Sequence, residues 1–277
     1  MKYILLAVIS LIVFSCEKKS YNVQNLKNGN IELLGHGGMG VGFKYPINSS
    51  LSVSSCMEIN ADGTELDIQL SKDSVLVAYH NNFLSEDASC EGLVNQHDWQ
   101  NINHCRYSSI YSNSLQVMSL RKLFEENNSF IGKTIILDCK LYFSSQPVKS
   151  FFMSFARSLQ RLYQDFDGVN IIVETTSKKF VASLKKVGYS GEILYNNPDI
   201  QEAINVAFTN SLYGISSDNA IITSENIKEA HKKGLYVSLF GVTSKRQNRS
   251  AIKKSPDFIQ SDKIVYLLKE FEKYKTN

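Results

Sequence analysis

The chain has 277 residues, of which 43% are hydrophobic and 21% are charged. This length suits one folded domain, and a single α/β barrel of about 250 residues would use nearly all of it. The formal net charge of +3 is too small to indicate a polyanionic partner, and no basic segment is long enough to form a nucleic-acid surface. We therefore expect no nucleic-acid ligand.

The first residues have the pattern of a bacterial signal segment. Lys2 precedes a short apolar run over residues 3–14. A run of this length is typical of a secretory signal, because a membrane-spanning helix needs about 20 apolar residues. The letters VFSC at its end resemble a lipobox in which Cys16 is lipidated, and simple cleavage near Ser15 is the alternative. We predict a signal peptide with a lipobox-like cysteine over residues 1–16.

The next segment is short and polar. Residues 17–29 predict a tether that lifts the following domain off a membrane, and residues 30–277 then form that domain. Lipidation of Cys16 would make the protein a lipid-anchored lipoprotein of the cell envelope that faces the periplasm or the exterior. We expect a monomer that is held at the membrane through this anchor.

Beyond residue 30, short β-rich runs alternate with segments of helical pattern. The runs that predict strands are residues 31–36, 64–70, 133–140, 169–174, 191–196, 212–216, 235–242 and 257–261. A further run over residues 73–80 follows a tight turn, and it predicts an extension of the second strand.

The segments between most of these strands predict helices. They are residues 48–60, 114–127, 148–166, 177–188, 199–208, 224–234 and 243–254. Eight strand–helix alternations indicate parallel strands that are joined by helical crossovers. We predict an α/β fold, a single-domain (β/α)8 TIM barrel, with an open doubly wound sheet as the alternative. Functional groups of such a barrel lie at the carboxyl ends of its strands.

Acidic residues interrupt two of the apolar strands. Glu65 and Asp67 are two positions apart and so project from one face, and Asp138 and Lys140 repeat this spacing on the third strand. Buried carboxylates are costly without a cation, and their oxygens suit Ca²⁺ or Mg²⁺. Simple pairing of Lys140 with Asp138 or Glu65 is the alternative, but it leaves a surplus of negative charge. We favour a divalent metal site.

Two histidines end strands beside this acidic cluster. His36 ends the first strand and His80 ends the run after the second. Imidazoles in such places serve as general base and general acid, although a lone histidine is more often structural. The glycines after His36 match G-x-G-x-x-G, but Gly42 and Pro46 break the helix that a dinucleotide turn requires. These glycines instead let the backbone approach a phosphate or metal.

The cysteines beyond the signal segment are even in number, which permits disulfides outside the cytoplasm. They are Cys56, Cys90, Cys105 and Cys139. Their sequence leaves three connectivities open. Cys90 and Cys105 bracket one loop, and a bridge there would close it. His97 and His104 in this loop raise a zinc alternative, but their spacing fits no zinc pattern.

These motifs together resemble the glycerophosphodiester phosphodiesterase family, within the phosphatidylinositol-phospholipase-C-like barrels. The family's landmarks are H-R-G, E-N, G-A-D-x-x-E-x-D, H-D and E-x-K. This sequence has GHGG, PIN, NADGTELDIQLSKDSVLVAYHNN and LDCK in the same order. Near the end, EAHKKGLYVSLFGVTS and PDFIQSD look like the family's last strands. The similarity covers residues 30–262.

The resemblance implies a role for each matching residue. The divalent metal, Ca²⁺ or Mg²⁺, would be bound by Glu65, Asp67 and Asp138. His36 and His80 would be the acid–base pair, and Lys140 would contact the phosphate. The implied reaction is metal-dependent hydrolysis of glycerophosphodiesters, a small-molecule substrate, to glycerol 3-phosphate and an alcohol.

The chain departs from the family pattern at several positions and therefore looks like a divergent member. Gly37 stands where the family has Arg, Ile47 replaces the Glu of E-N, and Asn81 replaces the Asp of H-D. Asp138 is one methylene shorter than the usual Glu. The missing Arg removes a bidentate phosphate contact.

These departures leave two other functions open. One is a non-catalytic barrel that binds a phosphorylated polyol or a lipid head group, and its main support is Gly37. The other is a phospholipase D-like lyase that forms cyclic phosphates, to which the cysteine-bracketed loop bears a faint similarity. Glu174 ends the fourth strand and could face the site, but the resemblance does not require it, so we leave it out of the ligand set.

Overall fold

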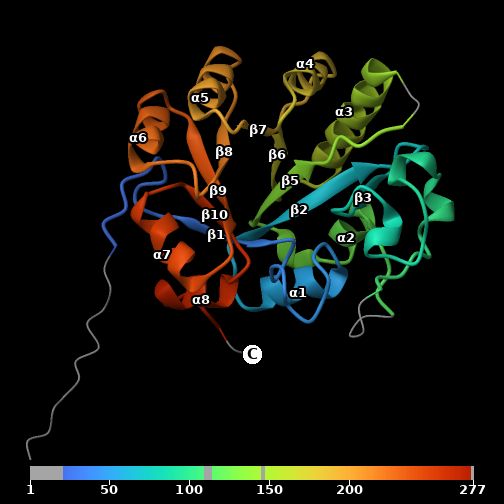
Figure 1. Cartoon of the computed structure of the whole chain (residues 1–277), viewed down its shortest axis with the longest axis horizontal. Helices are drawn as coiled ribbons and strands as arrows, with labels where there is room; N and C mark the ends of the chain where they lie inside the picture. The colour runs from blue at the N-terminus through green and yellow to red at the C-terminus, as the bar shows by residue number, and fades with distance from the viewer. Residues whose placement is uncertain (1–20, 109–113, 145–146, 276–277) are drawn as a thin grey trace, which may run out of the picture.

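The structure is a computed structural model that describes residues 21–108, 114–144 and 147–275, so the predicted signal peptide and Cys16 lie outside the described residues. Eight parallel strands close into a barrel with helices around it, which confirms the predicted single-domain TIM barrel (Figure 1). The barrel strands are β1 (Glu32–His36), β2 (Gly63–Leu70), β5 (Thr134–Cys139), β6 (Asn170–Thr175), β7 (Glu192–Asn196), β8 (Gly214–Asp218), β9 (Tyr236–Val242) and β10 (Phe258–Ser261).

Parallel pairing runs once around the barrel. Each strand pairs with the next in the order β1, β2, β5, β6, β7, β8, β9, β10, and β1 closes the ring against β10. At the closure Gly35 lies beside Thr64 on one side and beside Ser261 on the other. A Cβ on Gly35 would lie 1.7 Å from the carbonyl oxygen of Gly38. This close approach accounts for Gly35, the first glycine of the glycine-rich stretch, which lies within β1.

The helices cover the outside of the barrel. They are α1 (Ser50–Glu58), α2 (Leu120–Glu125), α3 (Val148–Asp165), α4 (Lys178–Lys186), α5 (Ile200–Thr209), α6 (Ser224–Lys232), α7 (Lys245–Lys253) and α8 (Ile264–Glu270). Helix α3 shows why they form: its buried residues recur every three or four positions, as in Phe155, Leu159 and Leu162. Helix α8 was not predicted. None of the described helices is both long and apolar enough to cross a membrane.

The region between β2 and β5, residues 71–133, differs from the prediction, and we call it the insertion. Residues 73–80 do not extend β2, because the chain reverses where the Ser71 amide donates to the Val75 carbonyl at 2.9 Å. The chain then forms β3 (Leu76–Ala78), which runs antiparallel to β2, and the short β4 (Met118–Ser119) pairs with β3. Helix α2 therefore begins later than predicted. Short 3-10 turns lie between these strands and before β5: Leu84–Glu86, Val94–Gln96, Trp99–Asn101 and Asn128–Phe130.

A disulfide joins the ends of the long loop in this insertion. Cys90 and Cys105 are bonded, with their Cα atoms 5.6 Å apart, and Cys56 and Cys139 are buried free thiols. The bridge is part of a small apolar cluster with Tyr79, and this cluster is separate from the main core. The disulfide therefore stabilises a satellite of the barrel that has a small apolar cluster of its own.

Removing this disulfide is expected to destabilise the insertion. A Cys90→Ser/Cys105→Ser protein should lose about 3 kcal/mol in the free energy of unfolding of this region, because a loop of about 15 residues is no longer closed in the unfolded chain. Hydrogen exchange would show faster exchange in residues 84–107 and unchanged protection of the barrel strands. Equal loss of protection in both regions would contradict this separation.

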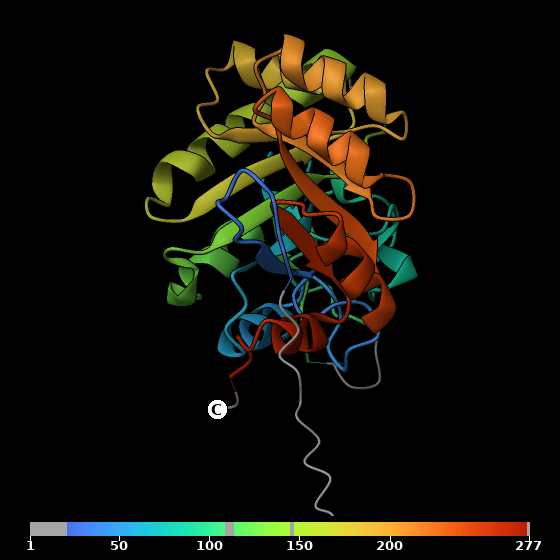
Figure 2. The same cartoon turned by 90° about the vertical axis from the view of Figure 1, so that its left-hand side faces the viewer.

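The segment before β1 packs against the amino end of the barrel. The Leu26 amide donates to Asp257 Oδ1 at 2.9 Å, and the Asn25 side chain donates to the Pro256 carbonyl at 2.8 Å. The Tyr21 hydroxyl donates a hydrogen bond to Glu270 Oε2 at 2.8 Å. Figure 2 shows this segment, in blue, in front of the barrel strands. Contacts with the barrel thus begin within the residues that the sequence assigns to the tether.

Candidate active site

Alternation along the barrel strands builds a polar layer on top of an apolar one. Apolar side chains from five strands meet inside the barrel: Leu34, Ile136, Ile172, Leu194 and Phe258. The residue two positions later on each strand faces the same interior, because side chains on a strand alternate. These later residues are all polar: His36, Asp138, Glu174, Asn196 and Gln260. The carboxyl end of the barrel therefore gathers polar and ionisable side chains.

Three carboxylates from β2 and β5 converge in this layer. Glu65, Asp67 and Asp138 each contribute an oxygen that lies within 4.8 Å of the other two. Glu65 is only 2% exposed and Asp67 only 1%. Burial raises the pKa of Glu65 well above its usual value, and the nearby charge of Asp67 raises it further. Oxygen donors clustered in this way fit a hard divalent cation such as Ca²⁺ or Mg²⁺.

Asn48 orients one of these carboxylates. Its Nδ2 donates to Asp67 Oδ2 at 2.8 Å, and its Oδ1 accepts from the Asp67 amide at 3.0 Å. Asn48 has a φ of 63° and is buried, a backbone conformation that asparagine adopts more readily than most residues. This amide belongs to the PIN motif, so the sequence contained the signal for it.

Lys140 lies against the same cluster. Its Nζ is 2.6 Å from Asp138 Oδ2 and 2.9 Å from Asp67 Oδ1. Burial opposes its charge, but the charges of Asp138 and Asp67 raise the pKa of Lys140 well above its usual value. Burial opposes the charge of Asp67 too, but Lys140 and then His80 lower the pKa of this carboxyl. One lysine does not balance the three carboxylates, which leaves the site attractive to a cation.

His36 is held between two carboxylates. Its Nδ1 lies 2.7 Å from Asp262 Oδ1, and its Nε2 lies 3.8 Å from Glu65 Oε2. Burial lowers the pKa of His36, but the hydrogen bond with Asp262 and the charge of Glu65 outweigh this and raise it to about 9. Asp262 was not predicted as a site residue, although it ends the PDFIQSD stretch that carries part of the family resemblance.

His80 lies on the other side of the cluster, just after β3. Its Nδ1 is 2.7 Å from Asn81 Oδ1. Its positive charge, when present, adds to that of Lys140 in lowering the pKa of Asp67. The two histidines therefore flank the carboxylates, one from β1 and one from the insertion.

The fold leaves no room for a side chain at position 37, where the H-R-G landmark has Arg. Gly37 has a φ of 57°, and a Cβ placed on it would lie 2.4 Å from Cβ of Ile47. The Gly37 amide donates to Glu65 Oε2 at 3.1 Å. The departures at Gly37 and Ile47 therefore belong together, because the loop that carries Ile47 fills the space in which a side chain at position 37 would begin.

Glu174 is a site residue that the prediction left out. It is 4% exposed, and burial, followed by the charge of Asp138, raises its pKa to about 7. Gln260 Nε2 donates to it at 3.2 Å and Asn196 Nδ2 donates at 3.4 Å. The strand alternation that places Asp138 in the barrel also places Glu174, and this was the available signal.

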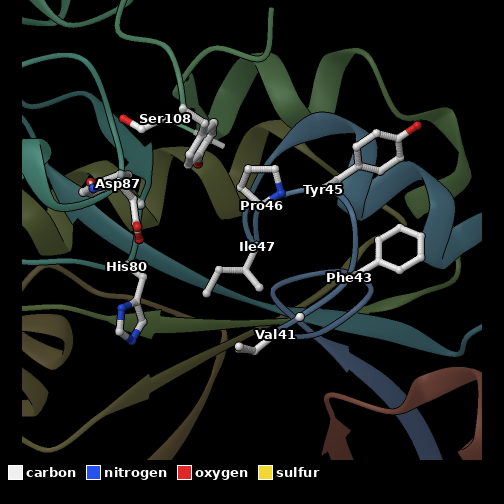
Figure 3. A pocket seen from close by; sticks show the side chains of 11 residues that line it. Val41, Phe43, Tyr45, Pro46, Ile47, His80, Asp87 and Ser108 are labelled. Carbon is white, nitrogen blue, oxygen red and sulfur yellow. Dashed lines mark hydrogen bonds between the residues drawn. The ribbon is translucent and has the colours of Figure 1, made fainter. Parts of the chain in front are cut away.

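Two adjoining cavities open at this end of the barrel. The first has a volume of about 420 Å³ and is lined by the carboxylates, both histidines, Lys140 and Glu174. The second, of about 370 Å³, is mostly apolar, and His80 lines both. Figure 3 shows Pro46 and Ile47 of the β1–α1 loop on one side of the second cavity and His80, Asp87 and Ser108 on the other side. The arrangement can hold a charged group on one side of His80 and an uncharged group on the other.

Solved structures share this fold. A phosphodiesterase from Oleispira antarctica, solved with its product sn-glycerol-3-phosphate, matches with a TM-score of 0.75 and 14% identity, over 86% of this chain and 96% of that one. A glycerophosphodiester phosphodiesterase from Parabacteroides distasonis matches with a TM-score of 0.70 and 18% identity, over 88% and 97% of the two chains.

Curated proteins match over a shorter region. A glycerophosphodiester phosphodiesterase of Bacillus altitudinis is 35% identical over 63 residues, which is 22% of this chain and 26% of that protein. The uncharacterized protein YqiK of Bacillus subtilis is 38% identical over 55 residues, 20% of this chain and 23% of that protein. The matched part of this chain thus spans about a quarter of each relative.

The family comparison covers most of the barrel. The model of the glycerophosphoryl diester phosphodiesterase family matches residues 39–265. This match extends from the loop after His36 to the start of α8, and so it includes every residue that lines the second cavity and all those that line the first except His36. The chain belongs to the glycerophosphoryl diester phosphodiesterase family.

Proposed function

We propose that the protein is a metal-dependent phosphoric diester hydrolase that cleaves glycerophosphodiesters to glycerol 3-phosphate and an alcohol. The observation that carries this proposal is the convergence of three carboxylates, one lysine and two histidines on one cavity of about 420 Å³. The family membership supports the reaction class. The glycerol 3-phosphate product in the Oleispira antarctica phosphodiesterase supports the same cleavage product.

Glu65, Asp67 and Asp138 would hold the cation, Ca²⁺ or Mg²⁺, through one oxygen each. Bound there, the cation would supply electrostatic stabilisation of the charge that gathers on the phosphoryl oxygens. Lys140 lies against two of these carboxylates, Asp67 and Asp138. With a cation neutralising their charge, its ammonium would be free to contact the phosphate. The backbone glycines after β1 let the substrate approach this edge.

His36 and His80 would move the protons. Each ring has its Nδ1 bonded to an oxygen acceptor, Asp262 for His36 and Asn81 for His80. This leaves Nε2 of each ring as the atom that gives or takes a proton. One imidazole would deprotonate the attacking oxygen and the other would protonate the leaving oxygen, which is how a phosphodiester is cleaved between two flanking groups.

The alcohol half of the substrate would lie in the second, apolar cavity. His80 lines both cavities, so a substrate that reaches across this ring would place its phosphate by the carboxylates and its alcohol between Ile47 and Tyr107. An apolar wall favours alcohols that carry methyl or methylene groups over strongly hydrated ones. The charged and the apolar parts of one diester would thus be separated by the reacting bond.

Phosphorus NMR tests the reaction directly. The purified protein would be incubated with glycerophosphocholine, glycerophosphoethanolamine and glycerophosphoglycerol, in Mg²⁺, Ca²⁺ or EDTA. The proposal expects glycerol 3-phosphate with a divalent cation and none in EDTA. A cyclic phosphate as the final product would show that the protein is a lyase and not a hydrolase. Cation-dependent binding of glycerol phosphate without any turnover would favour the binding barrel, for which the loss of Arg at position 37 is the support.

We also propose that Cys16 is lipidated and holds the barrel at the cell envelope. The lipobox-like VFSC stretch supports this. Expressed in a bacterium that processes lipoproteins, the chain should begin at Cys16, carry acyl chains and sediment with membranes, because two or more acyl chains anchor a protein stably. A Cys16→Ser protein should lose the acyl mass and leave the membrane fraction. A mature N-terminus at any other residue would contradict this assignment.

A further inference from the structure

We infer that Asp87 is a positioning residue that acts through Asn81 to fix the tautomer of His80. Three side chains form a continuous row of hydrogen bonds. His80 Nδ1 lies 2.7 Å from Asn81 Oδ1, and Asn81 Nδ2 donates to Asp87 Oδ2 at 2.5 Å. The inference rests on the proposed function, in which His80 transfers a proton.

The chemistry of the carboxylate decides the direction of the whole row. An ionised carboxylate only accepts hydrogen bonds, so Asn81 must turn its NH₂ group toward Asp87. Its carbonyl oxygen then faces His80, and a carbonyl also only accepts. Nδ1 of His80 must therefore carry the hydrogen. The neutral ring keeps its lone pair on Nε2, the nitrogen that would exchange a proton with the substrate.

The backbone holds Asp87 in a fixed place relative to His80. The Asp87 amide donates to the hydroxyl of Tyr79 at 3.3 Å, and Tyr79 immediately precedes His80 in the chain. The Ser108 amide donates to the Asp87 carbonyl at 2.8 Å. The Tyr79 hydroxyl in turn donates to the Leu84 carbonyl at 2.9 Å. Figure 3 shows His80 and Asp87 on the same side of the apolar cavity.

The same row explains a departure from the family motif. His36 reaches a carboxylate directly, through Asp262. His80 is followed by Asn81, where the family resemblance implies Asp, and a lone amide could turn either its oxygen or its nitrogen toward the ring. Asp87 fixes the orientation of the Asn81 amide, although Asp87 itself does not contact the ring through the hydrogen bonds of this row. The negative charge that the motif lacks at position 81 is thus supplied by the insertion.

Nitrogen NMR of the imidazoles tests the tautomer without any need for turnover. The full chain would be labelled with ¹⁵N-histidine, and the His80 signals would be identified by their loss in His80→Gln. At a pH where His80 is neutral, the wild-type ring should have its hydrogen on Nδ1. In Asp87→Asn the amide at position 81 is no longer constrained, so a mixture of the two tautomers is expected. Glu86→Gln, at a neighbouring acid whose side chain accepts from the Phe83 amide and not from Asn81, should keep the wild-type tautomer.

Exchanging the side chains of Asn81 and Asp87 gives a kinetic test, because the double variant is expected to recover the activity that each single variant loses. Loss of an outer partner that orients a metal-bound imidazole typically costs about 10- to 100-fold in metal affinity or activity, and we expect an effect of this size for His80, which lies beside the metal site. Asp87→Asn should therefore lower kcat on glycerophosphocholine by about that factor with little change in KM. Asn81→Asp alone should also lower it, because two carboxylates then face each other. The double protein Asn81→Asp/Asp87→Asn should recover most of the activity, since the new carboxylate at position 81 would accept directly from Nδ1.

The outcomes separate this inference from the proposed function. A wild-type tautomer and wild-type kcat in Asp87→Asn would overturn the inference, and so would a double protein that is no better than either single one. An inactive wild-type chain with the expected tautomers would overturn the phosphodiesterase and leave the positioning of His80 by Asp87 supported.

Discussion

Replacement of Glu65 by Gln should abolish stabilisation by Ca²⁺ or Mg²⁺ and lower kcat/KM by about a thousand-fold. Glu65, Asp67 and Asp138 have oxygens within 4.8 Å of one another, and Gln keeps the shape of Glu65 while removing one negative ligand. Cation chemistry at a phosphoryl group contributes several kcal/mol to the barrier, and about 4 kcal/mol corresponds to this loss. The Gly37 amide can still donate to the amide oxygen, so the fold is expected to persist.

Thermal unfolding separates ligand loss from misfolding. At a cation concentration of about 100 times its Kd, the wild-type protein should gain about 2.7 kcal/mol and roughly 5 to 10 °C in Tm. Glu65→Gln should gain almost nothing. In EDTA the variant should be at least as stable as the wild type, because a buried charge beside Asp67 is gone. Glu58→Gln, on the exposed end of α1, is the matched control and should respond to the cation like the wild type.

An equal rise in Tm for Glu65→Gln and the wild type would show that the cation binds elsewhere. A full loss of activity together with an unchanged cation response would assign Glu65 a role other than metal ligation. Either result would contradict the carboxylate site.

Replacement of His36 by Ala should lower kcat by about 10²- to 10⁴-fold, the range for loss of a general acid or base. The ring is fixed by Asp262 at 2.7 Å and lies 3.8 Å from Glu65. Asp262→Asn should lower kcat by a smaller factor, because the amide oxygen can still accept from Nδ1 but no longer stabilises a charged ring. Steady-state kinetics with saturating cation would measure both, with KM changing less than kcat.

His104→Ala is the matched control, since His104 is an exposed histidine in the disulfide-closed loop. It should keep wild-type kcat. Near-wild-type activity in His36→Ala would remove this residue from the proton transfers, and the assignment of an acid–base pair would then be wrong.

The barrel strands could be predicted from the sequence because strands of a closed parallel barrel are buried on both faces. They appear as short apolar runs, and β2 is buried at every position, including its polar residues. The carboxylates were visible for the same reason: Glu65 and Asp67 are out of place on a buried strand unless they have a function.

The insertion could not be predicted in the same way. Strands β3 and β4 have only three and two residues, so neither shows a period in the sequence. Their pairing depends on the turn near Ser71 and on long-range contacts. Helix α8 is also short, and its apolar residues directly follow a predicted strand, where periodicity does not separate a buried helix from a loop.

The supporting residues of the site were missed because their roles arise from the closure of the barrel. Asp262 follows β10, which pairs with β1, and only this pairing brings it to His36. Asp87 is six positions beyond Asn81 in an irregular segment, and no spacing rule connects the two side chains. Glu174 was visible at the end of its predicted strand, and it was left out only because the family resemblance does not require it.

A crystal structure of the protein with Mg²⁺ or Ca²⁺ and sn-glycerol 3-phosphate would test the central claim most directly. The claim predicts a cation bound by Glu65, Asp67 and Asp138, with the phosphate between Nε2 of His36 and Nε2 of His80. A cation bound at other residues, or a phosphate that leaves either imidazole out of hydrogen-bond reach, would contradict it.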